Sequence, residues 1–165
     1  MRIVTLHDHP EFIAALAALH LPQWPAAHPG WTLADWQREF QHHAAGRFRR
    51  TLVALADDGA VLGSASLVED DMEGETTLTP WLANVLVLPQ ARGRGVGGAL
   101  IDAIVTAAHE LGHTALYLFT EDQQALYARR GWAPVERRAF KGKPVDIMRL
   151  SLQDYFFAAQ KQPTM

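Results

Sequence analysis

Four glycines lie within the six residues Gly93–Gly98, in the run R-G-R-G-V-G-G, and apolar residues at helical spacing follow them. Glycine loses more backbone entropy on folding than any other residue, so such a cluster needs a reason. A short loop that enters a helix exposes backbone N–H groups at the positive end of the helix dipole, and this arrangement binds phosphate. Arg92 and Arg94 flank the glycines and can add charge-assisted contacts. The segment therefore predicts a site for a phosphate-bearing ligand.

The same glycines satisfy G-x-G-x-x-G, the pattern of dinucleotide-binding loops. In those loops the first glycine directly follows a strand, whereas Pro89–Arg92 intervenes here. The chain after Gly98 is also too short for the strand–helix repeats that the dinucleotide fold adds. No Gly-Lys-Ser/Thr follows, so the loop is not that of the P-loop nucleotide hydrolases. Both nucleotide interpretations are disfavoured.

A second motif, His109–His113, reads H-E-L-G-H and matches the H-E-x-x-H signature of zinc hydrolases. In those enzymes the helix runs through the second histidine, so that both rings lie on one face and bind the metal. Here Gly112 is a helix-ending residue, and Thr114–Phe119 is typical of a strand. We therefore expect the helix to end before His113 and no metal to bind. A zinc-dependent hydrolase remains an alternative.

The amino-acid composition narrows the classes of chemistry and partner that remain. The chain has 165 residues, no cysteine and a formal net charge of -3. Without cysteine there is no disulfide, thiolate nucleophile or cysteine metal site, and without a basic surface a nucleic acid is not expected as a partner. No apolar run is long enough for a membrane span, and the N-terminus does not resemble a signal peptide. We expect a cytoplasmic protein with one domain at residues 1–155 and a C-terminal tail at 156–165.

Hydrophobic periodicity predicts the elements that must position these motifs. Strands are expected at Arg2–Leu6, Thr51–Ala56, Ala60–Val68, Leu82–Leu88, Thr114–Phe119, Val135–Lys141 and Val145–Leu152. Helices are expected at Glu11–Leu19, after a capping box of Thr32 and Asp35, at Ala99–Leu111 and at Gln123–Arg130. Turns at Asp57–Gly59 and Gly142–Pro144 predict two hairpins, and the residues from about Lys161 are expected to be frayed. The order predicts a mixed α/β domain around one strand, glycine loop and helix.

Two segments resemble the GNAT superfamily of N-acetyltransferases. Val87–Gly97 is similar to the acetyl-coenzyme A loop of that family, Arg/Gln-x-x-Gly-x-Gly/Ala after a V-x-P strand exit, with Arg92, Gly95 and Gly97 at the motif positions. Ala125–Trp132 is similar to the family's L-Y-x-x-x-G-F segment after the next strand. The order of elements agrees over nearly the whole chain.

The resemblance implies an α/β (α+β) acyl-coenzyme A N-acyltransferase fold. In this fold a mixed, mostly antiparallel central sheet is flanked by helices, and its fourth and fifth strands splay apart. Acetyl-coenzyme A is implied as co-substrate, with its pantetheine beside the fourth strand and its pyrophosphate on the glycine loop. The residues implied to contact it are Leu86, Val87, Leu88, Arg92, Gly93, Arg94, Gly95, Val96, Gly97, Gly98, Thr120 and Tyr127.

The implied reaction is direct attack of a primary amine on the thioester carbonyl in a ternary complex. It needs a base for the ammonium, a donor for the oxyanion and an acid for the leaving thiolate. We expect a backbone N–H of Leu86 or Val87 to serve the oxyanion. The resemblance assigns Tyr127 as the acid, with a packed helix aromatic as the alternative.

The general base is where the sequence departs from the family. Several family members carry Glu or His at the place of Trp81, and an indole cannot accept the proton. Glu69 and Asp71 are the nearest alternatives, acting through water. The five carboxylates between Glu69 and Glu75 together favour a cationic acceptor, although a solvated loop would carry the same residues.

On the acceptor side we expect Asp70 and the indoles of Trp24, Trp31 and Trp81, which can offer cation–π contacts or pack in the core. The acceptor is a small cationic amine or the amine of a peptide or protein. A non-catalytic module that holds acyl-coenzyme A is a further alternative, and a homodimer is an open option.

Overall fold

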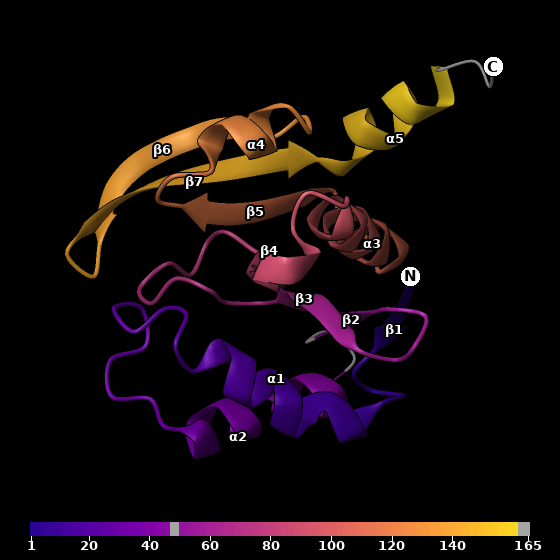
Figure 1. Ribbon diagram of the computed structural model, residues 1–165. Helices are drawn as coiled ribbons and strands as arrows, with labels where there is room; N and C mark the ends of the chain where they lie inside the picture. Colours follow the sequence, from indigo (N-terminus) through magenta and orange to yellow (C-terminus); the bar gives the residue numbers. More distant parts are fainter. Residues whose placement is uncertain (47–49, 162–165) are drawn as a thin grey trace. The chain divides into compact units, whose positions relative to one another are not determined.

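The computed structural model describes residues 1–46 and 50–161 and follows the predicted order of elements (Figure 1). The strands are β1 (Arg2–Thr5), β2 (Arg50–Leu55), β3 (Val61–Val68), β4 (Trp81–Val87), β5 (Ala115–Thr120), β6 (Ala133–Phe140) and β7 (Lys143–Ser151). The α-helices are α1 (Ile13–His20), α2 (Leu33–Ala45), α3 (Val96–Glu110), α4 (Gln124–Ala128) and α5 (Leu152–Lys161). Short 3-10 helices η1 (Pro10–Phe12) and η2 (Pro89–Ala91) precede α1 and the glycine loop.

Local chemistry explains where several elements begin and end. The predicted capping box of α2 is confirmed: the Asp35 N–H donates to Thr32 Oγ1 at 3.3 Å, and the Thr32 N–H donates to Asp35 Oδ2 at 2.8 Å. Gly59 has φ +87° in the turn between β2 and β3, a conformation that glycine adopts without a Cβ penalty.

The strands form a seven-stranded mixed sheet in the order β1-β2-β3-β4-β5-β7-β6. The pairs β1–β2, β2–β3, β5–β7 and β6–β7 are antiparallel, and β4–β5 is parallel. In the described residues one Cα pair joins β4 to β5, Trp81 with Tyr117, as expected for strands that splay apart. The predicted mixed, mostly antiparallel sheet is confirmed.

The chain divides into two compact units, one of Met1–Glu69 with Leu82–Ile104 and one of Asp70–Trp81 with Val105–Met165. In the first unit, α1 and α2 cover one face of β1–β3 (Figure 1). The core there consists of residues from both helices and β2, with Leu6. It comprises Leu6, Leu16, Ala17, Trp36, Phe40, Val53 and Leu55.

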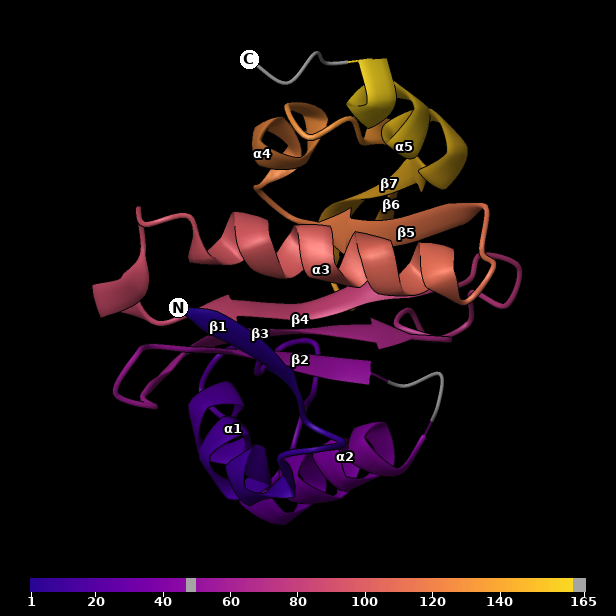
Figure 2. The same ribbon diagram turned by 90° about the vertical axis from the view of Figure 1, so that its right-hand side faces the viewer.

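The start of α3 packs on the strands of the first unit, beside β4 and β3 (Figure 2). Its contact depends on Gly63 of β3, because an added Cβ would lie 3.3 Å from Leu100 Cδ1 and 2.4 Å from the carbonyl oxygen of Leu86. Gly63 therefore allows α3 and β4 to approach β3 closely, a requirement that the sequence analysis missed.

In the second unit, β5 and β7 supply many of the buried residues, among them Leu116, Leu118 and Ile147. β6 is the outer strand, and most of its side chains are exposed. Helix α4 lies against the β6–β7 hairpin, and α5 follows the end of β7 (Figure 1). No helix in the described part of the chain is long and apolar enough to cross a membrane.

Most predicted bounds lie within two residues of the observed ones, and three differences matter for the fold. Helix α3 begins at Val96 rather than at Ala99, so the last two glycines of the cluster are helical. The second hairpin turns at Lys141 and Gly142, with φ +48° and +80°, because Pro144 already pairs with Ala139 in the ladder.

Helix α5 was not expected, and it runs across the predicted boundary between residues 155 and 156. Leu152, which the periodicity assigned to the end of a strand, is its first residue and its buried anchor. Residues 162–165, expected to be frayed, lie outside the described residues.

Candidate functional site

The glycine loop joins η2 to α3 within the first unit. Gly93 and Gly95 have φ +73° and +80°, and no atom lies within 4 Å of a Cβ added to either. The conformation therefore needs glycine, and the side on which a side chain would lie is open. Gly97 has a different role, because its Cβ would come 3.3 Å from Val87 Cγ2, so it lets α3 pack against the end of β4.

Backbone donors face this loop at the start of α3. The first helical hydrogen bond is donated by the Ala99 N–H to the Gly95 carbonyl at 3.0 Å. The N–H groups of Val96 and Gly97 precede it, and first-turn N–H groups have no partner within their own helix. The dipole of the fifteen-residue helix adds partial positive charge at the same end. This arrangement suits an anion such as a diphosphate.

Two arginines flank the loop in different ways. Arg92 Nε donates to the carbonyl oxygen of Val87 at 3.2 Å, which ties the loop back to the last residue of β4. Arg94 is exposed in the loop itself. One positively charged group thus lies beside the strand end and one beside the glycines, and their contacts with a phosphate stay predictions.

Tyr127 lies on α4 in the second unit, one turn before Gly131. Its ring packs edge-on against Trp132, with centroids 5.8 Å apart, and the residue is 8% exposed. Burial raises the pKa of Tyr127 to about 12, and Arg130 opposes this rise. The hydroxyl is therefore protonated at neutral pH, as an acid must be, although it is a weaker acid than an exposed tyrosine.

The short helix that carries Tyr127 is held at its start by polar contacts. Gln124 Nε2 donates to Asp146 Oδ2 of β7 at 2.5 Å, and Thr120 Oγ1 accepts from the Gln123 N–H at 3.0 Å. Thr120, a predicted contact of the co-substrate, thus shapes the turn between β5 and α4. The sequence analysis did not identify Asp146 as a residue that holds α4 in place, since nothing in the sequence pairs it with Gln124.

The acidic segment is divided between paired and exposed carboxylates. Glu75 accepts from Thr77 Oγ1 at 2.7 Å and from Arg138 of β6 at 3.0 Å. These bonds, those from Thr77 most of all, lower the pKa of Glu75 to about 2. Glu73 lies 3.9 Å from the Lys141 ammonium. Two of the five carboxylates, Glu73 and Glu75, are therefore paired with Lys141 and Arg138, basic residues in and just after β6.

The predicted base and steering residues begin the same segment. Glu69 and Asp70 are exposed, and Asp71 is half-buried. Glu69 belongs to the first unit, and Asp70 and Asp71 belong to the second. Their roles as base and as acceptor contacts stay predictions.

The three tryptophans predicted on the acceptor side differ in exposure. Trp24 and Trp31 are half-buried and pack against the core of the first unit, with the Trp31 ring 5.0 Å from that of Trp36. Trp81 is 0% exposed, and its Nε1 donates to the Leu78 carbonyl at 2.7 Å. The edges of Trp24 and Trp31 can therefore meet a ligand more readily than Trp81 can, and the acceptor-side role stays a prediction.

The H-E-L-G-H segment has its expected break. Helix α3 ends at Glu110, and Gly112 takes φ +86°, so His113 lies beyond the helix. His109 stacks on Phe156 of α5, with ring centroids 4.2 Å apart. Among the residues that the structure describes, no group of three or more His, Asp or Glu could hold a metal ion.

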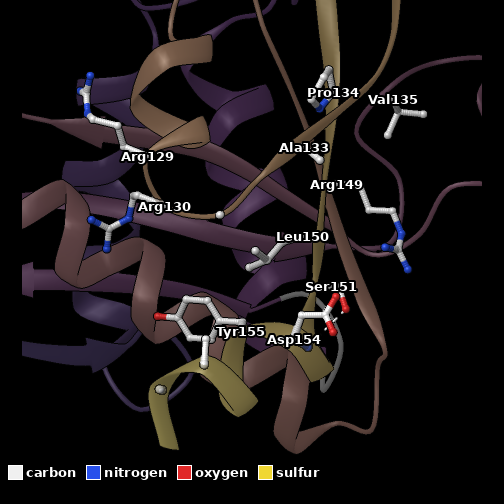
Figure 3. A pocket seen from close by; sticks show the side chains of 13 residues that line it. Arg129, Arg130, Ala133, Pro134, Val135, Arg149, Leu150, Ser151, Asp154 and Tyr155 are labelled. Atoms are coloured by element: carbon white, nitrogen blue, oxygen red, sulfur yellow. Dashed lines mark hydrogen bonds between the residues drawn. The ribbon is translucent and has the colours of Figure 1, made fainter. Parts of the chain in front are cut away.

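A separate hollow of about 740 Å³ lies in the second unit (Figure 3). Arg129 and Arg130 line its α4 side, and Asp154 and Tyr155 line its α5 side. Its lining also includes Ser151 of β7, which pairs with Ala115 at the start of β5. Helix α4, which carries Tyr127, follows the other end of β5. None of the predicted site residues lines this hollow.

Comparison with known families gives a match over most of the chain. The model of the acetyltransferase (GNAT) family matches residues 13–132, which include the glycine loop and Tyr127. No curated protein matches the chain.

Solved structures share the fold at low sequence identity. An aminoglycoside 6'-acetyltransferase type Ii is 17% identical, with a TM-score of 0.71 over 92% of this chain and 97% of that one. An aminoglycoside 6'-N-acetyltransferase complexed with coenzyme A is 15% identical, with a TM-score of 0.74 over 92% and 97%. A spermidine/spermine N-acetyltransferase from Vibrio cholerae is 13% identical, with a TM-score of 0.71 over 96% of each chain.

Proposed function

Because the chain belongs to the acetyltransferase (GNAT) family, we propose that it transfers an acetyl group from acetyl-coenzyme A to a primary amine that is cationic in solution. The observation that carries the proposal is the glycine loop at the start of α3. The open space beside Gly93 and Gly95, the first-turn N–H groups and the two arginines suit a diphosphate by their charge and accessibility.

The residues of the first unit would hold the co-substrate. The pyrophosphate fits the loop from Arg92 to Gly98, and the pantetheine pairs with the backbone of Leu86–Leu88. Acetyl-coenzyme A supplies the activated thioester, so the protein has to bind, orient and move protons. A backbone N–H of Leu86 or Val87 donates to the oxygen on which negative charge develops.

Tyr127 gives its proton to the leaving sulfur. The protonated phenol supports this role, since its raised pKa keeps the proton available at neutral pH. Glu69 or Asp71 removes the proton of the acceptor ammonium, directly or through a water molecule. Thr120 shapes the turn that leads into α4, and it contacts the co-substrate together with Tyr127.

The acceptor is proposed to be a small amine or a peptide amine with positive charge. Asp70, with its exposed carboxylate, and the half-buried indoles of Trp24 and Trp31 suit such a cation. Trp81 contacts the acceptor only if the residues that bury its indole move away. Structural relatives named for aminoglycosides and for spermidine favour an amine of this kind. A cytoplasmic location and a homodimer stay predictions.

The proposal is tested by release of coenzyme A with a panel of amines, measured as free thiol. The chain has no cysteine, so the protein adds no background. We expect acetyl-coenzyme A to release thiol only when an amine is present, and polyamines to be used faster than uncharged amines. Tight binding of acetyl-coenzyme A without thiol release from any acceptor would favour the non-catalytic binding module instead.

A further inference from the structure

Helix α4, which carries Tyr127, is too short to hold its own orientation. It has five residues, Gln124–Ala128, and isolated helices shorter than about 12 residues are marginal in water. Its direction is therefore set by the contacts that the rest of the second unit makes with its two ends. The place of the Tyr127 hydroxyl follows from that direction.

The C-terminal end of α4 is fixed by Trp132. The Trp132 N–H donates to the Tyr127 carbonyl at 3.1 Å, and Gly131, with φ +91°, makes the turn between them. Trp132 is 3% exposed, and its ring packs edge-on against that of Tyr127. This end of the helix, together with the Tyr127 ring, is therefore anchored by burial.

The start of α4 is held by two polar side chains from neighbouring strands. Thr120 of β5 and Asp146 of β7 lie directly opposite each other in the antiparallel ladder, so their side chains share one face of the sheet. Thr120 Oγ1 accepts from the Gln123 N–H at 3.0 Å, and Asp146 Oδ2 accepts from Gln124 Nε2 at 2.5 Å. The second bond ends on a carboxylate, which makes it the stronger of the two.

The bond between Asp146 and Gln124 also fixes the orientation of the Gln124 amide. Gln124 Nε2 donates a second hydrogen bond, to the Glu121 carbonyl at 3.0 Å, so both N–H groups of the amide are used. The Asp146 side chain is only 18% exposed. Its other partner, Arg137 of β6, approaches the same carboxylate oxygen at 3.9 Å and is mostly exposed. The contact with Gln124 is therefore the closer and better shielded one.

We infer that Asp146 is a positioning residue for proton transfer: through Gln124 it fixes the direction of α4 and thereby the place of the Tyr127 hydroxyl. The inference rests on the proposed function, in which Tyr127 gives its proton to the leaving sulfur. Without Asp146 the helix stays attached at Trp132 and its start is released, so it pivots about the buried end. A displacement of about 1 Å can cost on the order of a hundredfold in rate.

The test measures kcat for Asp146→Ala in the wild-type background and in the Tyr127→Phe background. In the wild-type background we expect kcat to fall on the order of ten- to a hundredfold, with the coenzyme A affinity unchanged in calorimetry. In the Tyr127→Phe background the same substitution should change kcat little, because the hydroxyl that it misplaces is already absent. Asp146→Asn keeps an acceptor oxygen for Gln124 Nε2 and should recover most of kcat.

Arg137→Gln is the matched control, because it removes the other partner of the same carboxylate and should leave kcat unchanged. Gln124→Met removes the donor from the other side and should lower kcat as Asp146→Ala does, which keeps the test decisive if Asp146→Ala does not fold. Thermal unfolding checks the fold of each variant.

The inference is overturned if Asp146→Ala and Gln124→Met keep the wild-type kcat, or if Asp146→Ala lowers kcat by the same factor in both backgrounds. In these two cases the wild type still acetylates its amine, so the proposed function stands. A wild type that transfers no acetyl group to any amine defeats the proposed function, and the inference with it.

Discussion

Arg92 Nε donates a hydrogen bond to the carbonyl oxygen of Val87, at 3.2 Å, and so closes the glycine loop onto the end of β4. Five residues separate the two along the chain. The strand end, where a pantetheine is expected, and the loop, where a diphosphate is expected, are thereby held as one piece of structure. Substitutions in the loop should therefore affect ligand binding more than folding.

Gly95→Val should abolish acetyl-coenzyme A binding and leave the domain folded. Gly95 has φ +80°, and a side chain there costs roughly 1–2 kcal/mol and fills the open face of the loop. Calorimetry measures the affinity and thermal unfolding measures the fold. Gly59→Val is the matched control, because its φ of +87° imposes similar strain in a distant hairpin. Equal affinity in the two variants would exclude the loop as the binding site.

Neutralising Glu69, Asp70 and Asp71 together should raise the KM of the acceptor, and the effect should shrink at high salt. The matched control is the neutral pair at Glu73 and Glu75, whose charges Lys141 and Arg138 already compensate. Initial rates at low and high salt measure both sets. A fall in kcat alone, independent of salt, would instead identify one of the first three residues as the base.

Tyr127→Phe should lower kcat by up to about 10²–10⁴-fold, with less effect on co-substrate affinity. Because the folded pKa is about 12, the rate should show no alkaline limb from this residue near pH 10. The same shift stabilises the fold below pH ~10, and that contribution is lost as pH rises towards 12. Unfolding at alkaline pH should therefore separate the variant from the wild type. An unchanged kcat with the best amine would leave Tyr127 as a packing residue.

Protein purified without chelator should contain no stoichiometric zinc, and His109→Ala should keep its acetyl transfer. Helix α3 ends before His113, so the two histidines do not share a helical face, and the His109 ring is stacked on Phe156. Metal analysis and thiol release check the two statements. Phe156→Ala should cost similar stability, since it removes the same stack. One tightly bound zinc ion per chain would restore the hydrolase alternative.

Much of this fold can be predicted from the sequence, because residues close together along the chain determine where many of its elements begin and end. Thr32 with Asp35, Asp57–Gly59, and the glycine cluster each announce an element boundary within a few residues. Helix α5 was not predicted because Leu152 continues the apolar pattern of β7, although Ser151 Oγ accepts from the Asp154 N–H at 3.3 Å at the start of the helix. The left-handed conformation of Asn84 was not predicted because nothing in the strand-like sequence of β4 announces it.

The candidate site was predictable where one segment carries the chemistry. The phosphate loop needs only Arg92–Gly98, so its residues could be named from the sequence. The compensation of Glu75 by Arg138 and the anchoring of Gln124 by Asp146 join residues distant along the chain. No periodicity encodes such pairs, and the base stays unassigned for the same reason.

The most direct test of the account is the fate of the acetyl group itself. Acetyl-coenzyme A with an isotopically labelled acetyl group is incubated with the protein and a polyamine. The masses of the products are then measured by mass spectrometry. The account predicts a polyamine that carries one labelled acetyl group on nitrogen, formed by the wild type and by Gly59→Val but not by Gly95→Val. Free labelled acetate without any acetylated amine would contradict it.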